Sequence, residues 1–170
     1  MLTLSPLAPE LKEQVADYKD EFLRNNDSLD GTAGLKEATS FDEWYQICLD
    51  NEKPETTHPG FVPATLYLAF NEQGRLVGMI HFRHYLNEYL LNFGGHIGYS
   101  VRKSERRKGY ATEMLALVLE EARKRELDKV LLTCNKANIA SARTIRKNGG
   151  VLENEVPQGN RTTQRYWITL

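Results

Sequence analysis

A strongly basic turn followed directly by small residues is the part of the chain best suited to chemistry. Five of the seven residues from Arg102 to Lys108 are cationic, and Gly109 and Ala111 come next. An apolar, strand-like segment precedes this turn and a segment with helical periodicity follows it, so the small residues fall where the helix begins. A helix N-terminus presents unpaired N–H groups and the positive end of the helix dipole. The segment therefore predicts a phosphate site, although a merely solvated basic turn would explain the charges equally well.

Other common phosphate-binding loops are missing from the sequence. There is no GxxxxGK[ST] pattern, and no GxGxxG pattern follows a strand, so neither a P-loop nor a Rossmann dinucleotide site is supported. A net charge of −1 and the lack of a basic surface interleaved with aromatic residues argue against nucleic acid as a partner. Cys48 and Cys134 lack metal-ligand spacing, so we expect buried free thiols and no metal site.

Length and composition indicate one globular domain spanning residues 1–170. Of the 170 residues, 41% are hydrophobic and 26% are charged, which is ordinary for a soluble protein. No apolar run approaches the roughly 18 residues of a membrane span. The first residues lack the basic and apolar regions of a signal peptide. We therefore expect a cytoplasmic protein with no membrane partner.

Periodicity predicts alternating helices and strands, and hence an α/β fold built on a mixed sheet. Ser40 and Glu43 form a capping box at the start of a short second helix. The expected helices cover residues 9–25, a short stretch from 40, 109–125 and 138–149. The expected strands cover residues 64–70, 76–84, 96–101, 129–134, 151–155 and 163–169, the first two as a hairpin.

Two motifs of the chain, one after the other, resemble those of a known superfamily. The spacing Arg106-x-x-Gly109-x-Ala111 resembles the R/Q-x-x-G-x-G/A signature of the GCN5-related N-acetyltransferases (GNAT), in the same place between a strand and a helix. Asn138 and Ser141 resemble the Asn-x-x-Ala/Ser element of that superfamily, ahead of a helix that ends in glycine. The order of elements also agrees over essentially the whole chain. Residues 94–101 and 148–150 are similar to a subgroup of predicted bacterial acetyltransferases.

The resemblance implies a fold and a cofactor site. The GNAT fold has about six to seven strands, helices on both faces and a V-shaped splay between two parallel motif strands. Acetyl-CoA, or coenzyme A, would lie in this splay as the donor substrate, without a metal. The implied cofactor-binding residues are Tyr99, Ser100 and Val101 along the pantetheine arm, Arg106, Arg107, Lys108, Gly109, Tyr110 and Ala111 around the pyrophosphate, and Asn138 and Ser141 on the other side. For Asn138, simple helix capping is an equally good explanation.

The resemblance further implies a transferase, specifically an acetyl-CoA-dependent N-acetyltransferase. An acetyl or other acyl group would pass directly, within a ternary complex, to a primary amine of a small molecule or protein. In many members a tyrosine four residues after the Ala/Ser acts as the general acid, but here that position is Ile145. Tyr99 or Tyr166 could supply the proton, or the thiolate could leave unassisted. The alternative is a catalytically weak module that binds or senses acyl-CoA.

The base and the acceptor are less defined by the sequence. His96 and Glu88 are candidate bases. In the family, bases tend to lie on the strand face that corresponds to Ile97, and strand alternation places His96 on the other face. The N-terminal helices and residues 58–63 are expected to select the acceptor. Acidic residues there could line its site or simply be solvated: Asp20, Glu21, Asp27 and Asp30. A homodimer is also left open.

Overall fold

Two antiparallel sheets form the body of the protein in the computed structural model, which describes residues 1–170. The larger sheet has the order β1-β2-β3-β4 and the smaller the order β5-β7-β6. Their bounds are β1 (Thr3–Pro6), β2 (Ala64–Phe70), β3 (Leu76–Arg83), β4 (Ile97–Val101), β5 (Lys129–Asn135), β6 (Val151–Gln158) and β7 (Arg161–Thr169). The predicted α/β class is confirmed. In place of one continuous mixed sheet, the strands form two antiparallel sheets. The sequence prediction missed β1, a four-residue edge strand that ends in a proline.

Four α-helices follow the predicted order. They are α1 (Lys12–Arg24), α2 (Phe41–Asp50), α3 (Tyr110–Lys124) and α4 (Ile139–Lys147). The predicted N-cap is present, because Ser40 Oγ accepts a hydrogen bond of 3.1 Å from the N–H of Glu43. The Glu43 carboxylate accepts a bond from the Thr39 hydroxyl instead of completing the capping box. A short π-helical turn (Leu90–Gly94) precedes β4. No helix combines the length and the apolar character that crossing a bilayer would require.

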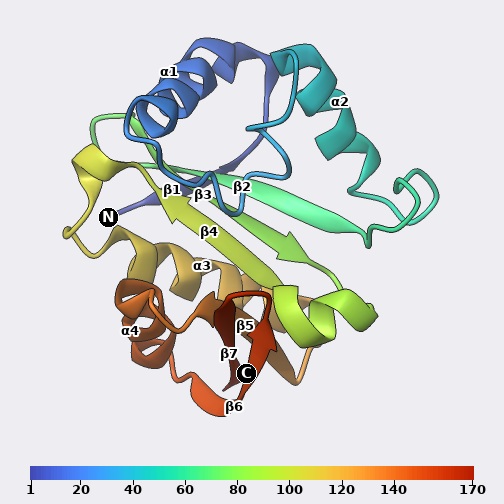
Figure 1. Ribbon diagram of the computed structural model, residues 1–170. Coiled ribbons are helices and arrows are strands. Elements are labelled where there is room, and N and C mark those ends of the chain that lie inside the picture. Colours follow the sequence, from blue (N-terminus) through green and yellow to red (C-terminus); the bar gives the residue numbers. More distant parts are fainter.

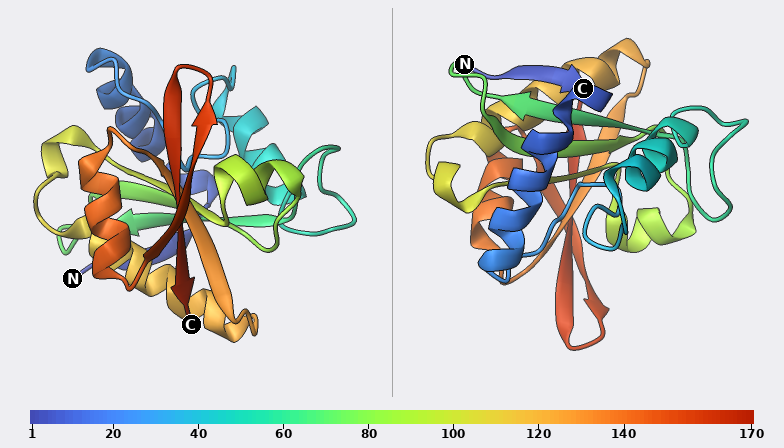
Figure 2. Two further views of the ribbon diagram at one scale, coloured as in Figure 1. Left: turned by 60° about the horizontal axis from the view of Figure 1, so that its bottom comes forward. Right: turned by 90° about the horizontal axis from the view of Figure 1, so that it is seen from above.

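The helices cover opposite faces of the larger sheet, as expected from the resemblance (Figure 1). On one face, α1 and α2 bury Tyr18, Phe22 and Trp44 against strands β2 and β3. On the other, α3 buries an apolar stripe that includes Met114 and Val118 in the larger of the two cores. The β6–β7 hairpin projects away from this layered body in the right view of Figure 2. The layers leave the ends of β4 and β5 in the middle of the molecule.

The two sheets meet where His96, directly before β4, lies beside Leu131 of β5. The N–H of His96 donates to Leu131 O at 2.7 Å, and the N–H of Leu131 donates to His96 Nδ1 at 2.9 Å. A Cβ atom at Gly95 would lie only 2.6 Å from Leu131 O, so the approach depends on glycine. Beyond this contact the strands belong to separate sheets, which produces the predicted splay.

Candidate functional site

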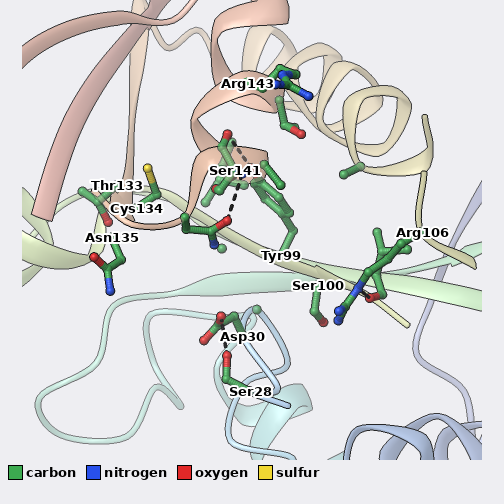
Figure 3. Close-up of a pocket in the computed structure, with 18 of the residues that line it drawn as sticks. Ser28, Asp30, Tyr99, Ser100, Arg106, Thr133, Cys134, Asn135, Ser141 and Arg143 are labelled. Atoms are coloured by element: carbon green, nitrogen blue, oxygen red, sulfur yellow. Dashed lines mark hydrogen bonds between the residues drawn. The ribbon is translucent and has the colours of Figure 1, made fainter. Parts of the chain in front are cut away.

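A cleft of about 830 Å³ opens where β4 and β5 separate. Its floor is the end of β4, and two walls face each other across it (Figure 3). The helix wall consists of Arg106, Arg107, Gly109, Tyr110, Ala111, Thr112, Asn138, Ala140, Ser141, Arg143 and Thr144. The loop wall consists of Asp27, Ser28, Asp30, Gly31 and Arg83. Residues from several separate parts of the chain therefore converge on one cavity.

The floor of the cleft exposes main-chain groups of alternate β4 residues. The N–H of Arg83 donates to His96 O at 2.7 Å, and the N–H of Arg102 donates to Val77 O at 3.0 Å. In an antiparallel ladder, residues between such pairs turn their N–H and C=O groups to the opposite side. The main chain of Tyr99 and Val101 therefore points away from β3 and toward the gap beside β5. Such groups can pair with amides of an extended ligand.

The turn before α3 prepares an anion site from backbone groups. Gly109 is the N-cap of α3 at φ +81°, a conformation that favours glycine, and no side chain caps this end. The N–H groups of the first turn are therefore free to face the cleft, together with the positive end of the helix dipole. Across the cleft, Asn138 caps α4, since its Oδ1 accepts a bond of 3.1 Å from the N–H of Ser141. Asn138 thus has the capping role and also lines the cleft.

Three cations of the basic turn are held by protein groups. Arg102 is 2% exposed, and its guanidinium pairs with Asp17 at 2.7 Å and Glu21 at 2.9 Å. Arg106 donates to Val101 O and to Asp27, both at 2.8 Å. Lys108 pairs with Glu105 at 2.6 Å and does not line the cleft.

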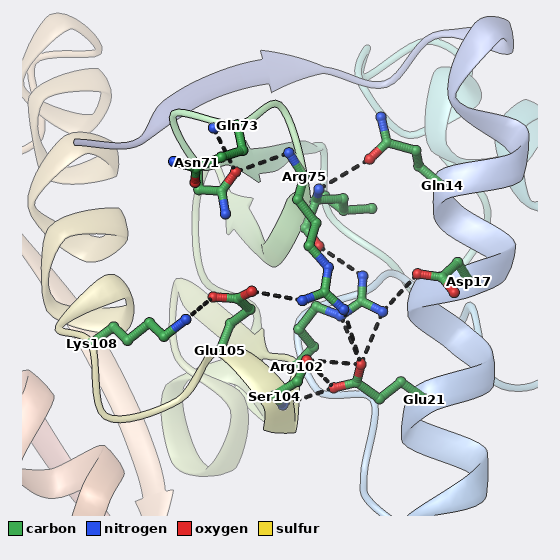
Figure 4. A network of polar contacts seen from close by, with 11 residues as sticks. Gln14, Asp17, Glu21, Asn71, Gln73, Arg75, Arg102, Ser104, Glu105 and Lys108 are labelled. Carbon is green, nitrogen blue, oxygen red and sulfur yellow. Dashed lines mark hydrogen bonds and ion pairs between the residues drawn. The ribbon is translucent and has the colours of Figure 1, made fainter.

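A buried network ties this turn to α1 and β3 (Figure 4). Glu21 accepts hydrogen bonds from both the N–H and the hydroxyl of Ser104, while Arg75 bonds Glu105 at 2.6 Å. Burial alone would raise the pKa of Glu21, but bonds from Ser104 and Arg102 outweigh it and lower that pKa. Removing one member of such a buried pair costs about 3–5 kcal/mol, because the remaining charge stays desolvated. The network fixes the backbone of the turn.

Two cations of the helix wall form no ion pair with the protein. Arg107 belongs to the basic turn, whereas Arg143 comes from α4 and lies near the top of the cleft in Figure 3. The sequence motif did not predict Arg143, since its position is defined only by the packing of α4 beside α3. These two side chains supply the positive charge of this wall.

Tyr99 is the one candidate catalytic residue that lines the cleft. Its hydroxyl lies 2.9 Å from Ser141 Oγ. Burial raises the pKa of Tyr99 to about 12, so the phenol keeps its proton at neutral pH. Tyr166 is buried elsewhere and donates to Gln164, and Ile145 is fully buried in the core.

The two candidate bases lie outside the cleft lining. Glu88 is exposed on the loop after β3. His96 is 5% exposed, and its Nδ1 accepts the hydrogen bond that joins β4 to β5. Burial, and then the Arg83 guanidinium, lower the pKa of His96 to about 4. This geometry gives His96 a structural role at the junction of the sheets.

The loop wall differs from the sequence expectation for the acceptor region. Asp27 and Asp30 line the cleft, whereas Asp20 and residues 58–63 do not. Glu21 lies in the buried network instead. The sequence did not predict that Gly31 and Arg83 line the cleft. Its only relevant signal was the loop-like composition around Gly31. In all, the structure brings ten of the eleven predicted cofactor-binding residues to one cleft, with Lys108 outside it.

Comparison with known proteins agrees with this geometry. The family model described as "Acetyltransferase (GNAT) domain" matches residues 2–151. The uncharacterized N-acetyltransferase YnaD of Bacillus subtilis (strain 168) is 30% identical over 100 residues, a match that spans 56% of this chain and 56% of the relative.

Two solved structures from Salmonella typhimurium share the fold. An acetyl transferase that modifies the N-terminal serine of the 50S ribosomal subunit protein L7/L12 aligns over 99% of this chain and 95% of its own, with a TM-score of 0.68 and 19% identity. The structure of yncA with its cofactor acetyl-CoA aligns over 99% of this chain and 94% of its own, with a TM-score of 0.67 and 13% identity. At these low identities the two structures show a shared fold. The chain belongs to the acetyltransferase (GNAT) domain family.

Proposed function

We propose that this protein transfers an acetyl group from acetyl-CoA to a primary amine. The observation that carries the proposal is the cleft at the β4–β5 splay, where an uncapped helix N-terminus faces open main-chain groups of β4. Coenzyme A has the matching features, since its pyrophosphate suits the N-terminus of α3 and its amide-bearing arm suits the strand. Membership of the GNAT family supports the same donor.

The phosphates would be held mainly by backbone N–H groups and by the two unpaired arginines. Arg107 and Arg143 line the cleft without protein partners, so their charge is available to a ligand. Lys108 is engaged by Glu105, and we assign it a structural role in the turn. The carboxylates around Arg102 and Lys108 also moderate the local positive charge. A phosphate would therefore meet a rigid turn with two flexible cations.

Transfer would proceed directly from the thioester to the amine in a ternary complex. Attack on the thioester places negative charge on its carbonyl oxygen, and the open main-chain N–H of Val101 is suited to stabilise it. The Tyr99 phenol is the proton donor that we assign to the departing thiolate, because it lines the cleft and stays protonated. The ammonium form of the acceptor would first lose one proton to water in the open cleft. The second proton, which the nitrogen loses after its attack, would replace the one that Tyr99 gives to the thiolate. No covalent enzyme intermediate is required.

Calorimetry with coenzyme A tests the donor site. We expect binding by the wild-type protein and a loss of at least about 100-fold in affinity for Gly109→Glu, because the new carboxylate stands where the phosphates would bind. Gly74→Glu is the matched control: Gly74 is also at positive φ, with open space around it, but lies in the β2–β3 turn. Equal affinity for both variants would overturn the cofactor assignment. Thiol release with an amine panel then separates an enzyme from a module that only binds acyl-CoA.

A further inference from the structure

Arg83 is a cation without a carboxylate partner at the loop wall of the cleft. It is the last residue of β3 and is half-buried. Its Nη1 donates to the carbonyl oxygens of Gly94 and Gly95, both at 3.1 Å. No carboxylate pairs with it, in contrast to Arg102, which directly follows the neighbouring strand β4. Confining a guanidinium in this way costs free energy unless an anion or sufficient hydrogen bonds compensate.

The unused donors of Arg83 face the cleft. Its Nε and Nη2 have no protein partner, and every fully buried side-chain nitrogen or oxygen in the protein has one, so these two atoms are accessible to solvent on a residue that lines the cleft. Nη2 lies 3.8 Å from the position of a Cβ at Gly98, and that position is 3.5 Å from Gly31 Cα. The free edge of the guanidinium therefore sits where the Asp27–Gly31 loop meets β4. A planar edge with parallel N–H groups matches a carboxylate.

The groups around Arg83 leave its positive charge uncompensated. Burial, and then Arg83 itself, lower the pKa of His81 to about 3, and His96 is likewise neutral at physiological pH. Asp30 also lines the loop wall and forms no ion pair; it accepts a bond of 2.7 Å from Ser28 Oγ. The loop wall thus carries one cation and one anion that form no ion pair within the protein.

Resting on the proposed function, we propose that the acceptor is a primary amine that also carries a carboxylate, and that Arg83 binds this carboxylate. Asp30 attracts the ammonium group as it enters. An amino acid or short peptide fits this pattern. A diamine does not, since its second ammonium would meet Arg83. The loop wall therefore selects the acceptor by charge.

Matched pairs of acceptors test the proposal on the acetyl-CoA complex. The panel contains α-, β- and γ-amino acids and dipeptides, each beside its carboxamide, with 1,4-diaminobutane as a further probe. For the accepted members, kcat/KM from thiol release should be about 10- to 100-fold higher for the acid than for the amide, the range of charge-assisted hydrogen bonds. Arg83→Gln should reduce that ratio to below about 3-fold and Arg83→Lys should keep part of it. Arg24→Gln, on the exposed end of α1, should leave the ratio unchanged.

Coenzyme A affinity, measured on the same variants, separates this proposal from the proposed function. Arg83→Gln should bind coenzyme A within about 2-fold of wild type, because Arg83 lies on the other wall. A wild-type protein that prefers amides or the diamine overturns the carboxylate proposal, as does a preference for acids that survives in Arg83→Gln. If coenzyme A binds but no acid in the panel reacts or shows calorimetric binding, the proposal also fails, and the donor site stands. Failure to bind coenzyme A would instead refute the donor site.

Discussion

The helix wall and the loop wall of the cleft are built by different means. The helix wall uses backbone N–H groups at the start of α3 and a capped turn of α4, each encoded by a short local motif. The loop wall uses side chains from the loop that follows α1 and from β3, which are distant in the sequence. The first arrangement suits a ligand that is the same across a family. The second can change residue by residue, as an acceptor site must.

The largest effect that would test this comparison is expected at Gly31. It has φ +66°, and a Cβ there would lie 2.4 Å from the main chain of Gly98 and Tyr99. Gly31→Ala should therefore lower the free energy of unfolding by about 3–5 kcal/mol, combining backbone strain with a steric clash. Urea denaturation measures the change. A loss of this size would show that the close contact between Gly31 and β4 stabilises the loop wall.

Gly34→Ala provides the control for that measurement. Gly34 is also at positive φ, +82°, but no atom lies within 4 Å of the point that an alanine Cβ would occupy there. This substitution should cost only about 1 kcal/mol, the usual penalty for a left-handed alanine. Similar losses for the two variants would show that the contact between Gly31 and β4 adds nothing.

The same contrast explains what the sequence could and could not predict. Strand and helix periodicity, the Ser40 cap and the Arg106–Ala111 motif depend on neighbours in the chain, and these features were predicted. The sequence predicted one phosphate-binding patch from five cations that lie close together in the chain. Three of them, Arg102, Arg106 and Lys108, instead form ion pairs with carboxylates of the protein. The sequence does not show these partners, because tertiary packing brings them together. Arg83 and Gly31 carry no specific local signal, because their role comes from β3, β4 and the loop after α1 meeting in space.

The junction between the sheets should show a pH-dependent stability. The pKa of His96 is about 4 in the folded protein, against an ordinary value of 6.5, so the unfolded chain binds more protons between these values. Stability from this group is complete above pH 6.5 and is lost as the pH falls toward 4. The loss for one such group is about 3 kcal/mol. Protonation also removes the Nδ1 acceptor for the Leu131 N–H.

A His96→Gln variant isolates this contribution. Glutamine keeps an oxygen acceptor near Leu131 but does not titrate, so the free energy of unfolding should fall less steeply between pH 6.5 and 4 than in wild type. Urea titrations at several pH values give both slopes. Parallel slopes would mean that His96 does not titrate in this range, and the junction would then need another explanation.

The smallest expected effect compares two cations of the donor region. Arg143 lines the cleft unpaired, so Arg143→Gln should weaken coenzyme A binding about 5- to 20-fold, as expected for losing one charge-assisted contact to a phosphate. Lys108 is held by Glu105 outside the cleft, and Lys108→Gln should change the affinity by less than about 2-fold. Calorimetry at low and high salt should show the Arg143 effect shrinking with ionic strength. A larger loss for Lys108→Gln would return that residue to the phosphate site and would mean that its ion pair opens when the cofactor binds.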